Sequence, residues 1–186
     1  MAVASMTAKE RQRASINQLG LWLFFLSESF LFAALATGRF YIDGLNRPEH
    51  LSQLLGLGIT SILLVSSLTA YRAEVAIANG DRTAFSRFLL ATIVLGVIFV
   101  AGVGMEWTIA EFDPSDPFGT AFFTMTGIHA THVISGIFML GLIYFLSSRG
   151  HFSAKKHWGV EGVVKYWHFV DVVWVFFYPI LYLITW

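Results

Sequence analysis

Residues 87–110 read RFLLATIVLGVIFVAGVGMEWTIA, and no charged residue stands between Arg87 and Glu106. A helix needs about 20 predominantly apolar residues to cross the hydrocarbon core of a bilayer. Pro114 and Pro117 follow shortly afterwards, and prolines end one helix and reset the chain before the next. The stretch therefore predicts a transmembrane helix that ends before an outer loop.

Four further apolar stretches flank it, so that the expected spans are 18–41, 51–71, 87–110, 118–147 and 163–186. No stretch alternates with the roughly ten-residue rhythm of a membrane β-strand. We therefore predict an all-α polytopic membrane protein with five transmembrane helices in one bundle. Residues 1–17 form a polar cytoplasmic tail in this interpretation, and residues 18–186 form a single transmembrane domain.

The positions of lysine and arginine predict how the chain lies in the membrane. Ten of them fall in the N-terminal tail, in the segment after the second span or around the segment after the fourth, against two, Arg39 and Arg47, on the other side. Positive residues favour the cytoplasmic side. We expect the N-terminus inside and the C-terminus outside. The first span is interpreted as a retained helix, because it is longer than a signal-peptide core and contains Glu28.

Composition excludes several classes of function. Hydrophobic residues make up 56% of the chain and charged residues only 13%, whereas a soluble domain has about 25% charged residues. The formal net charge is zero, which argues against a nucleic-acid partner held by a basic face. The sequence contains no cysteine, so disulfides, thiolate metal sites and cysteine nucleophiles are excluded. All interhelical segments are short, and no soluble catalytic domain is expected.

Ionisable residues inside the spans are the candidates for chemistry, because they are costly in hydrocarbon. At about 1.5 Å per helical residue, Glu28, His129 and His132 all fall near the middle of the membrane. His168 and Asp171 lie in the inner half of the last span. Within each of the pairs His129/His132 and His168/Asp171 the spacing of three predicts a shared helix face. Glu106 lies near the outer end of its span, where we expect interfacial water to reach it.

Three interpretations of these residues remain open. Glu28, His129 and His132 could bind a metal ion, since carboxylate and imidazole are suitable ligands, and His132 with His168 could be proposed for haem. Chains of buried carboxylates and histidines also serve as proton relays. The interpretation that we favour is a hydrogen-bonded network that fixes helix register, with Glu28 protonated or paired with a histidine. Seven aromatic residues mostly fall near the predicted interfaces, as in aromatic belts: Tyr41, Tyr71, Trp107, Trp158, Trp167, Tyr182 and Trp186.

Four ordered motifs resemble subunit III of the haem-copper terminal oxidases, in particular the short five-helix bacterial form of cytochrome c oxidase subunit III. Residues 166–174, YWHFVDVVW, look like the signature of that family's final helix, and residues 127–136, GIHATHVISG, look like the motif of the preceding helix. Residues 26–32, LSESFLF, resemble the helix with the family's buried glutamate. Residues 105–107, MEW, and Glu161 match further family positions.

The resemblance implies an accessory subunit without catalytic, cofactor-binding or metal-binding residues of its own. Haem and copper would belong to partner subunits. The expected partners are subunit I as the main contact, subunit II, a small subunit IV and membrane phospholipids. The implied role is to bind phospholipid and to support proton uptake and stability of the catalytic core, in a bacterial cytoplasmic membrane. The residues linked to lipid, protons or a buried polar network would be Glu28, Glu106, His129, His132, Glu161, His168 and Asp171.

One departure from the family pattern affects the lipid-binding expectation. Longer members have seven helices, and this sequence lacks the first two, which form one wall of the family's lipid cleft. Ser27-Glu28 resembles cytochrome c oxidases more than quinol oxidases. The alternatives are subunit III of a quinol oxidase, the related accessory subunit of nitric oxide reductase, and a stand-alone proton-coupled transporter.

Overall fold

The computed structural model describes residues 8–46, 48 and 51–184. Over these ranges the chain is helical throughout, apart from short turns and one isolated bridge. Its elements are α1 (Ala8–Asp43), α2 (Gln53–Ala78), α3 (Arg82–Ile109), α4 (Pro117–Ser148), α5 (Trp158–Tyr178) and the π-helical segment η2 (Pro179–Leu183). Five helices are long and apolar enough to cross a membrane. The prediction of an all-α fold with five spans is confirmed.

The helices are longer than the expected spans, because local sequence signals place their ends in the polar segments. α1 already begins at Ala8, ahead of the expected span from residue 18. Between α2 and α3 only residues 79–81 are non-helical. Gly80 has a φ of 81° there, a left-handed conformation that favours glycine, and the Asp81 side chain accepts the Ala84 N–H at 2.9 Å as the N-cap of α3. Pro117 opens α4, where its missing N–H costs nothing.

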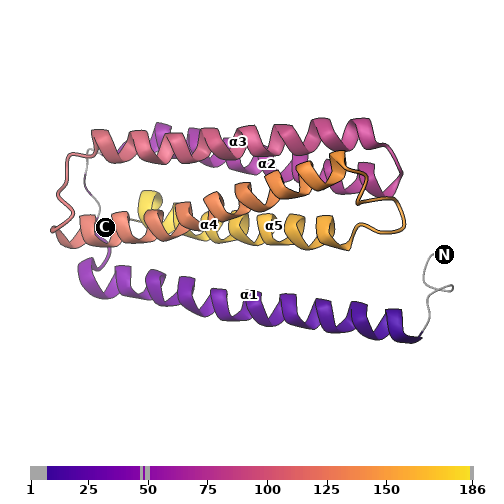
Figure 1. Cartoon of the computed structure of the whole chain (residues 1–186). Coiled ribbons are helices and arrows are strands. Elements are labelled where there is room, and N and C mark those ends of the chain that lie inside the picture. The colour runs from indigo at the N-terminus through magenta and orange to yellow at the C-terminus, as the bar shows by residue number, and fades with distance from the viewer. Residues whose placement is uncertain (1–7, 47, 49–50, 185–186) are drawn as a thin grey trace.

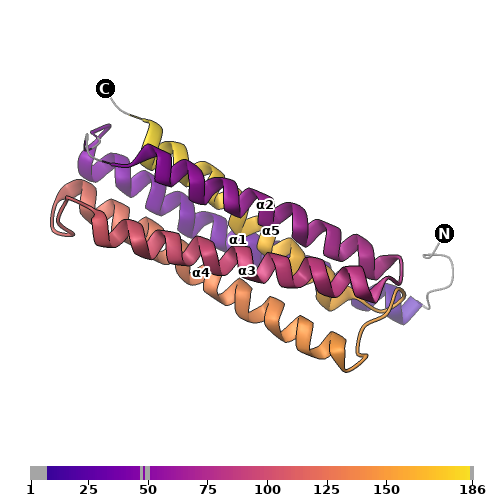
Figure 2. The same ribbon diagram turned by 90° about the horizontal axis from the view of Figure 1, so that it is seen from above.

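Helices α2, α3, α4 and α5 form an up-and-down four-helix bundle, and α1 lies outside it against α4 and α5 (Figure 1, Figure 2). In the bundle α2 contacts α3 and α5, and α4 contacts α3 and α5. Only 11% of the apolar window of α1 is buried inside the chain, against 28–50% for the other helices. Most of the surface of α1 is therefore left for lipid or for another chain.

Trp167 lies at the centre of the bundle, where two glycines make room for it. A Cβ atom on Gly96 of α3 would lie 2.6 Å from the ring of Trp167, and one on Gly136 of α4 would lie 2.8 Å from it. The indole N–H donates to Ser66 Oγ of α2 at 3.0 Å. The expectation that Trp167 belongs to an interfacial belt was wrong, because this hydrogen bond and the glycine gap let the ring be buried at 1% exposure.

Arg39 closes the C-terminal end of α1. Its guanidinium donates to the carbonyl of Gly44 at 2.9 Å and to the carbonyl of Asn46, and it pairs with the carboxylate of Asp43 at 3.5 Å. The same group lies 5.0 Å from the ring centroid of Phe118 at the start of α4. Arg39 is only 1% exposed, so it acts on the end of its own helix rather than as a free surface cation.

Candidate functional site

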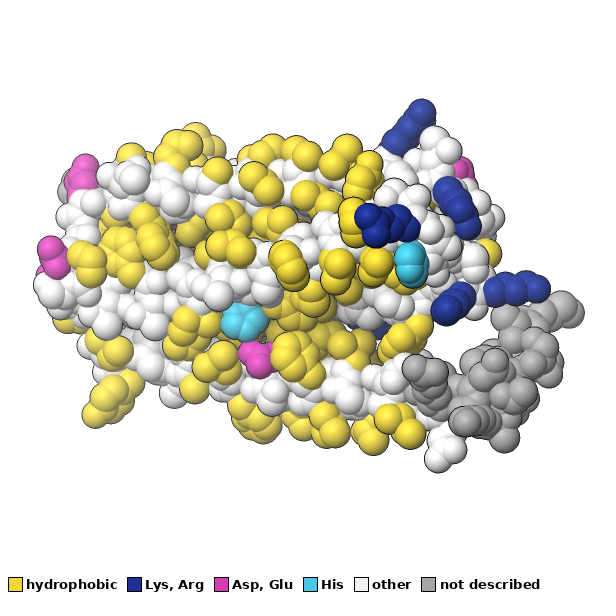
Figure 3. All heavy atoms as spheres, in the orientation of Figure 1, with side chains coloured by type: hydrophobic (Ala, Val, Ile, Leu, Met, Phe, Trp, Pro, Cys, Tyr) yellow, Lys and Arg dark blue, Asp and Glu magenta, His cyan; other side chains and the backbone are white. Residues whose placement is uncertain are grey.

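Glu28 and His132 meet midway along α1 and α4. The His132 Nε2 atom lies 3.1 Å from Glu28 Oε2, and the His132 Nδ1 atom lies 2.8 Å from the carbonyl of Ile128 one turn earlier. The Glu28 side chain is 21% exposed and the His132 side chain is 18% exposed. Phe32 packs edge-on against the imidazole, with centroids 4.8 Å apart. Figure 3 shows a histidine and an acidic side chain adjoining on the face where α1 meets the bundle. These contacts tie α1 to α4.

His129 has a different environment from His132, although three residues separate them. It is fully buried, and its Nε2 atom lies 3.1 Å from the carbonyl of Val170 in α5. Its ring packs on Trp174 with centroids 4.7 Å apart and on Phe99 at 5.7 Å. Its Nδ1 atom has no hydrogen-bond partner. The structure thus directs His129 into the bundle and His132 towards α1.

His168 and Asp171 face α2 from α5. The Ser67 hydroxyl lies 2.6 Å from His168 Nδ1. Asp171 is 3% exposed, and neither of its carboxyl oxygens has a hydrogen bond within normal geometry. Its carboxyl group is therefore buried without a bonded partner.

Glu106 lies near the C-terminal end of α3, but water does not reach it. The residue is 2% exposed, and Tyr182 donates its hydroxyl to Glu106 Oε2 at 2.6 Å. The ring of Tyr182 passes over Gly56, where a Cβ atom would lie 2.6 Å away. The expectation of a solvated Glu106 was therefore wrong, because Tyr182 of η2 packs against the ends of α2 and α3.

Glu161 belongs to a small charged group in the first turn of α5. Its carboxylate lies 3.2 Å from His157 Nε2 and 3.3 Å from Lys165 Nζ. Glu74 of α2 is close enough to interact electrostatically with these groups. Lys165 also lies 5.0 Å above the ring of Trp158. The group is at the opposite end of the bundle from Glu106.

The seven residues expected to be linked to lipid, protons or a buried polar network are distributed over separate places. Glu28 contacts His132, while each of the other five has partners of its own or none. Within the described residues no group of three or more histidine, aspartate or glutamate side chains could hold a metal ion. Sequence reasoning missed three hydroxyl side chains of α2 that bond α5. Thr60 accepts from Trp174 and Ser66 accepts from Trp167, while Ser67 shares a hydrogen bond with His168. The available signal was the series of hydroxyl side chains in the expected span 51–71, at Ser52, Thr60, Ser61, Ser66, Ser67 and Thr69.

Several hollows open on the surface of the described residues, and two of them are described here. One, of about 320 Å³, lies between α1 and α5 and is almost entirely apolar; its lining is Ser29, Phe32, Ala33, Ala36, Phe169, Val172, Val173, Phe176, Phe177 and Ile180. The groove formed by these ten residues is called the α1–α5 groove below. Its length runs along two membrane-spanning helices, so an apolar chain suits it better than a polar solute.

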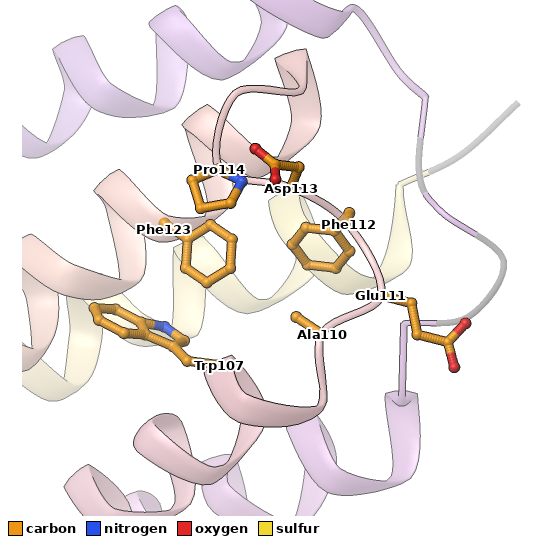
Figure 4. A pocket seen from close by; sticks show the side chains of 7 residues that line it. All are labelled: Trp107, Ala110, Glu111, Phe112, Asp113, Pro114 and Phe123. Atoms are coloured by element: carbon orange, nitrogen blue, oxygen red, sulfur yellow. The ribbon is translucent and has the colours of Figure 1, made fainter.

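The second hollow lies beside the α3–α4 connection, against the rings of Trp107, Phe112 and Phe123 (Figure 4). The Trp107 N–H donates to Thr126 Oγ1 at 3.0 Å and so fixes the indole. On the connecting loop, hydrogen bonds from the Ser115 hydroxyl and N–H hold the pKa of the exposed Asp113 carboxyl below its ordinary value. The end of the bundle with the α3–α4 connection is therefore acidic and rich in aromatic rings.

These features define a class of protein: a multi-pass membrane helix bundle whose ionisable interior groups are paired or buried separately. The sequence matches the family described as cytochrome c oxidase subunit III over residues 7–186. It is 34% identical over 174 residues to cytochrome c oxidase subunit 3 of Thermostichus vulcanus, an alignment that covers 90% of this chain and 87% of the relative.

Similarity extends to eukaryotic proteins of the same name. Identity is 36% over 177 residues with the Neurospora crassa protein, which covers 88% of this chain and 66% of the relative. Identity is 35% over 176 residues with the Mus musculus protein, in an alignment that covers 88% of this chain and 67% of the relative. The chain belongs to the cytochrome c oxidase subunit III family, and the resemblance of its four motifs to that family is confirmed. Membership implies a place in a multi-subunit oxidase complex.

Proposed function

We propose that this chain is the accessory, non-redox subunit of a respiratory cytochrome c oxidase in a bacterial cytoplasmic membrane. In this proposal it packs on subunit I, which together with subunit II holds haem and copper, and it binds phospholipid. It also supports proton uptake and the stability of the catalytic core during oxygen reduction. Family membership supports the subunit assignment, and the exposed surface of α1 supports a place for lipid or another chain beside it.

The observation that carries the phospholipid proposal is the α1–α5 groove. Nine of its ten lining residues are apolar and one, Ser29, carries a hydroxyl; that hydroxyl already donates to the carbonyl of Phe25 at 2.7 Å. A lipid acyl chain gains from contact with such a surface and requires no hydrogen bond from it.

Two substitutions on α5 test the lipid proposal. Val172→Trp fills the α1–α5 groove, whereas Val175→Trp adds the same ring at a valine outside the groove lining; these valines are 53% and 46% exposed. We expect Val172→Trp to lower the phospholipid retained per purified complex, measured by mass spectrometry after mild detergent extraction, and Val175→Trp to leave it unchanged. Equal retention in both variants and the parent would contradict lipid binding in this groove.

The partner proposal is tested by purification of the tagged chain in mild detergent. We expect a haem-containing subunit I and a subunit II to copurify, and we expect the isolated chain to show no haem absorbance. Copurification with a quinol-oxidising core, or with a nitric oxide reductase core, would replace the proposed complex with one of these alternatives. Stoichiometric haem in the isolated chain would contradict the non-redox assignment.

A further inference from the structure

The hollow beside the α3–α4 connection has aromatic rings as its wall and carboxylates at its rim. It measures about 750 Å³ and lies between the end of α3, the connection itself and the second turn of α4. Figure 4 shows the rings of Trp107, Phe112 and Phe123 grouped around it, with the side chains of Glu111 and Asp113 outside the rings. Ligand-binding hollows in proteins measure roughly 300–1,000 Å³. This hollow is large enough to receive a side chain of another molecule.

The aromatic wall is held in place by contacts within the chain. Trp107 packs edge-on against Phe123 with ring centroids 5.5 Å apart, and it donates its N–H to Thr126 Oγ1 at 3.0 Å. Phe112 packs edge-on against Phe118, with centroids 5.2 Å apart. A preformed surface loses less conformational freedom on binding than a mobile one. The three rings can therefore receive a ligand without rearrangement.

Hydrogen bonds within the connection fix its backbone and its charges. The Ser115 N–H and hydroxyl donate to Asp113 Oδ1 at 2.8 Å and 2.6 Å, and the Asp113 N–H donates to Asp116 Oδ2 at 2.9 Å. The Thr120 hydroxyl donates to the carbonyl of Pro114 at 2.8 Å. Hydrogen bonds donated to a carboxylate favour its ionised form. The exposed Asp113 carboxyl therefore keeps its negative charge at neutral pH.

The charge of the connection indicates which ligands the hollow complements. From Glu111 to Asp116 the sequence reads EFDPSD, with three acidic residues and no lysine or arginine. Arg39, which lies against the start of α4, is 1% exposed and pairs with Asp43 of its own helix. A cation is attracted to such a site and an anion is repelled. The hollow therefore suits a positively charged group and not a phosphate.

The separation of rings and carboxylates narrows the kind of cation. A ligand that fits both needs an apolar part against the rings and a positive charge at the rim. Lysine and arginine side chains have an apolar stem and a charged head, and their heads are also attracted to aromatic faces. The chain uses this pairing internally, since the Arg39 guanidinium lies 5.0 Å from the centroid of Phe118 and Lys165 Nζ lies 5.0 Å from that of Trp158. A zwitterionic lipid headgroup would bring its phosphate to the same carboxylates.

We propose that this hollow binds a lysine or arginine side chain from a loop of a partner protein. The stem packs on the rings of Trp107 and Phe123, and the head pairs with the carboxylates at the rim. An exposed ion pair contributes little by itself, so contact between stem and rings carries most of the affinity. The family of this chain forms multi-subunit complexes, which supplies partner chains at the membrane surface. The surface is separate from the α1–α5 groove.

Fluorine-19 spectra of the full chain in lipid nanodiscs test the chemistry of the site. Trifluoromethylphenylalanine replaces Phe123 in the hollow or, as a control, Phe138, which is 73% exposed on the same helix outside the hollow. We expect an acetylated tri-arginine amide to shift the resonance at position 123 and not at position 138. The tri-citrulline peptide, which lacks the charge, should shift neither. Equal shifts at position 123 from the two peptides, or none from either, would overturn the proposal.

Removal of the carboxylates tests their part in binding. Glu111→Gln combined with Asp113→Asn removes two charges, while the amide oxygen at position 113 can still accept from Ser115. We expect the arginine-induced shift to be lost in this variant, and a shift of unchanged size would contradict the role of the carboxylates. Phosphocholine is the third probe. A shift from phosphocholine as large as that from the arginine peptide would assign the hollow to a lipid headgroup and overturn the protein partner.

The purified complex shows whether a partner fills the hollow. In complex isolated in mild detergent with the label at position 123, we expect the arginine peptide to cause no shift, because the partner's side chain already occupies the site. A shift as large as in the nanodisc would overturn the proposal. Copurification tests the oxidase assignment separately. Haem-containing subunits together with failed peptide binding contradict this inference alone, whereas peptide binding without a haem-containing complex contradicts the proposed function alone.

Discussion

Most polar side chains inside the bundle bond a single neighbour close by. Trp174 donates to Thr60 Oγ1 at 2.9 Å, and Thr60 in turn donates to the carbonyl of Gly56 at 2.7 Å. His129 uses a backbone carbonyl of α5. Such pairing is required in a membrane, where each unsatisfied polar group costs several kcal/mol. Among the described residues the exceptions inside the bundle are both carboxyl oxygens of Asp171, Glu106 Oε1 and His129 Nδ1.

Tyr182→Phe tests the residue-scale account of Glu106. The substitution removes the hydroxyl that donates to Glu106 Oε2, while the second oxygen already lacks a partner. A buried polar group left without its hydrogen bond costs about 1–3 kcal/mol, so we expect a lower thermal unfolding midpoint in detergent. Tyr41→Phe is the control, because Tyr41 is 91% exposed. If both variants unfolded like the parent, the buried hydrogen bond would contribute no stability.

At the scale of elements, glycines decide how closely the helices approach. Gly102 of α3 would place a Cβ atom 2.5 Å from Ile59 of α2, and Gly136 of α4 faces the ring of Trp167. Small residues permit such contacts in lipid, where helix association depends on close packing.

Gly136→Ala and Gly141→Ala on α4 form a matched pair that tests this packing. A Cβ atom at Gly136 would clash with the fully buried ring of Trp167, whereas one at Gly141 would meet no atom within 4 Å. We expect Gly136→Ala to destabilise the bundle by about 1–3 kcal/mol through overpacking. Gly141→Ala should stabilise it by up to about 1 kcal/mol through helix propensity. Denaturation in mixed micelles measures both. Similar effects from the two variants would argue against a close contact between α4 and α5.

At the scale of the whole molecule, charge separates the two ends of the bundle. The basic side chains visible in Figure 3 gather at the end with the α2–α3 and α4–α5 connections. The α3–α4 connection at the other end has Glu111, Asp113 and Asp116 and no lysine or arginine. Because positive residues favour the cytoplasmic side, the basic end is predicted to lie inside.

Single cysteines check this orientation in intact cells. Ser115→Cys lies in the α3–α4 connection and Ser153→Cys in the α4–α5 connection. We expect a membrane-impermeant maleimide to label Ser115→Cys from outside and to label Ser153→Cys only after the cells are opened. The reverse pattern would place the N-terminus outside. The parent chain, which has no cysteine, supplies the background.

The sequence by itself determined the number of spans, because 20-residue apolar stretches and the prolines between them are local features. It also indicated the family, since four motifs that resemble that family occur in order along the chain. It could not determine which polar groups meet. Spacing of three placed His129 and His132 on one helix face, yet one bonds α5 and the other bonds α1.

The tertiary structure alone decided these partners, because helix periodicity fixes which residues share a face but not which neighbour covers it. Trp167 shows the reason: its burial needs gaps at Gly96 and Gly136, on two helices distant in sequence. Glu106 shows it again, since η2 brings Tyr182 over a residue 76 positions earlier in the chain. Such packing sets the rotation and approach of whole helices. It therefore determines that the ionisable residues lie apart from one another, except for Glu28, which contacts His132.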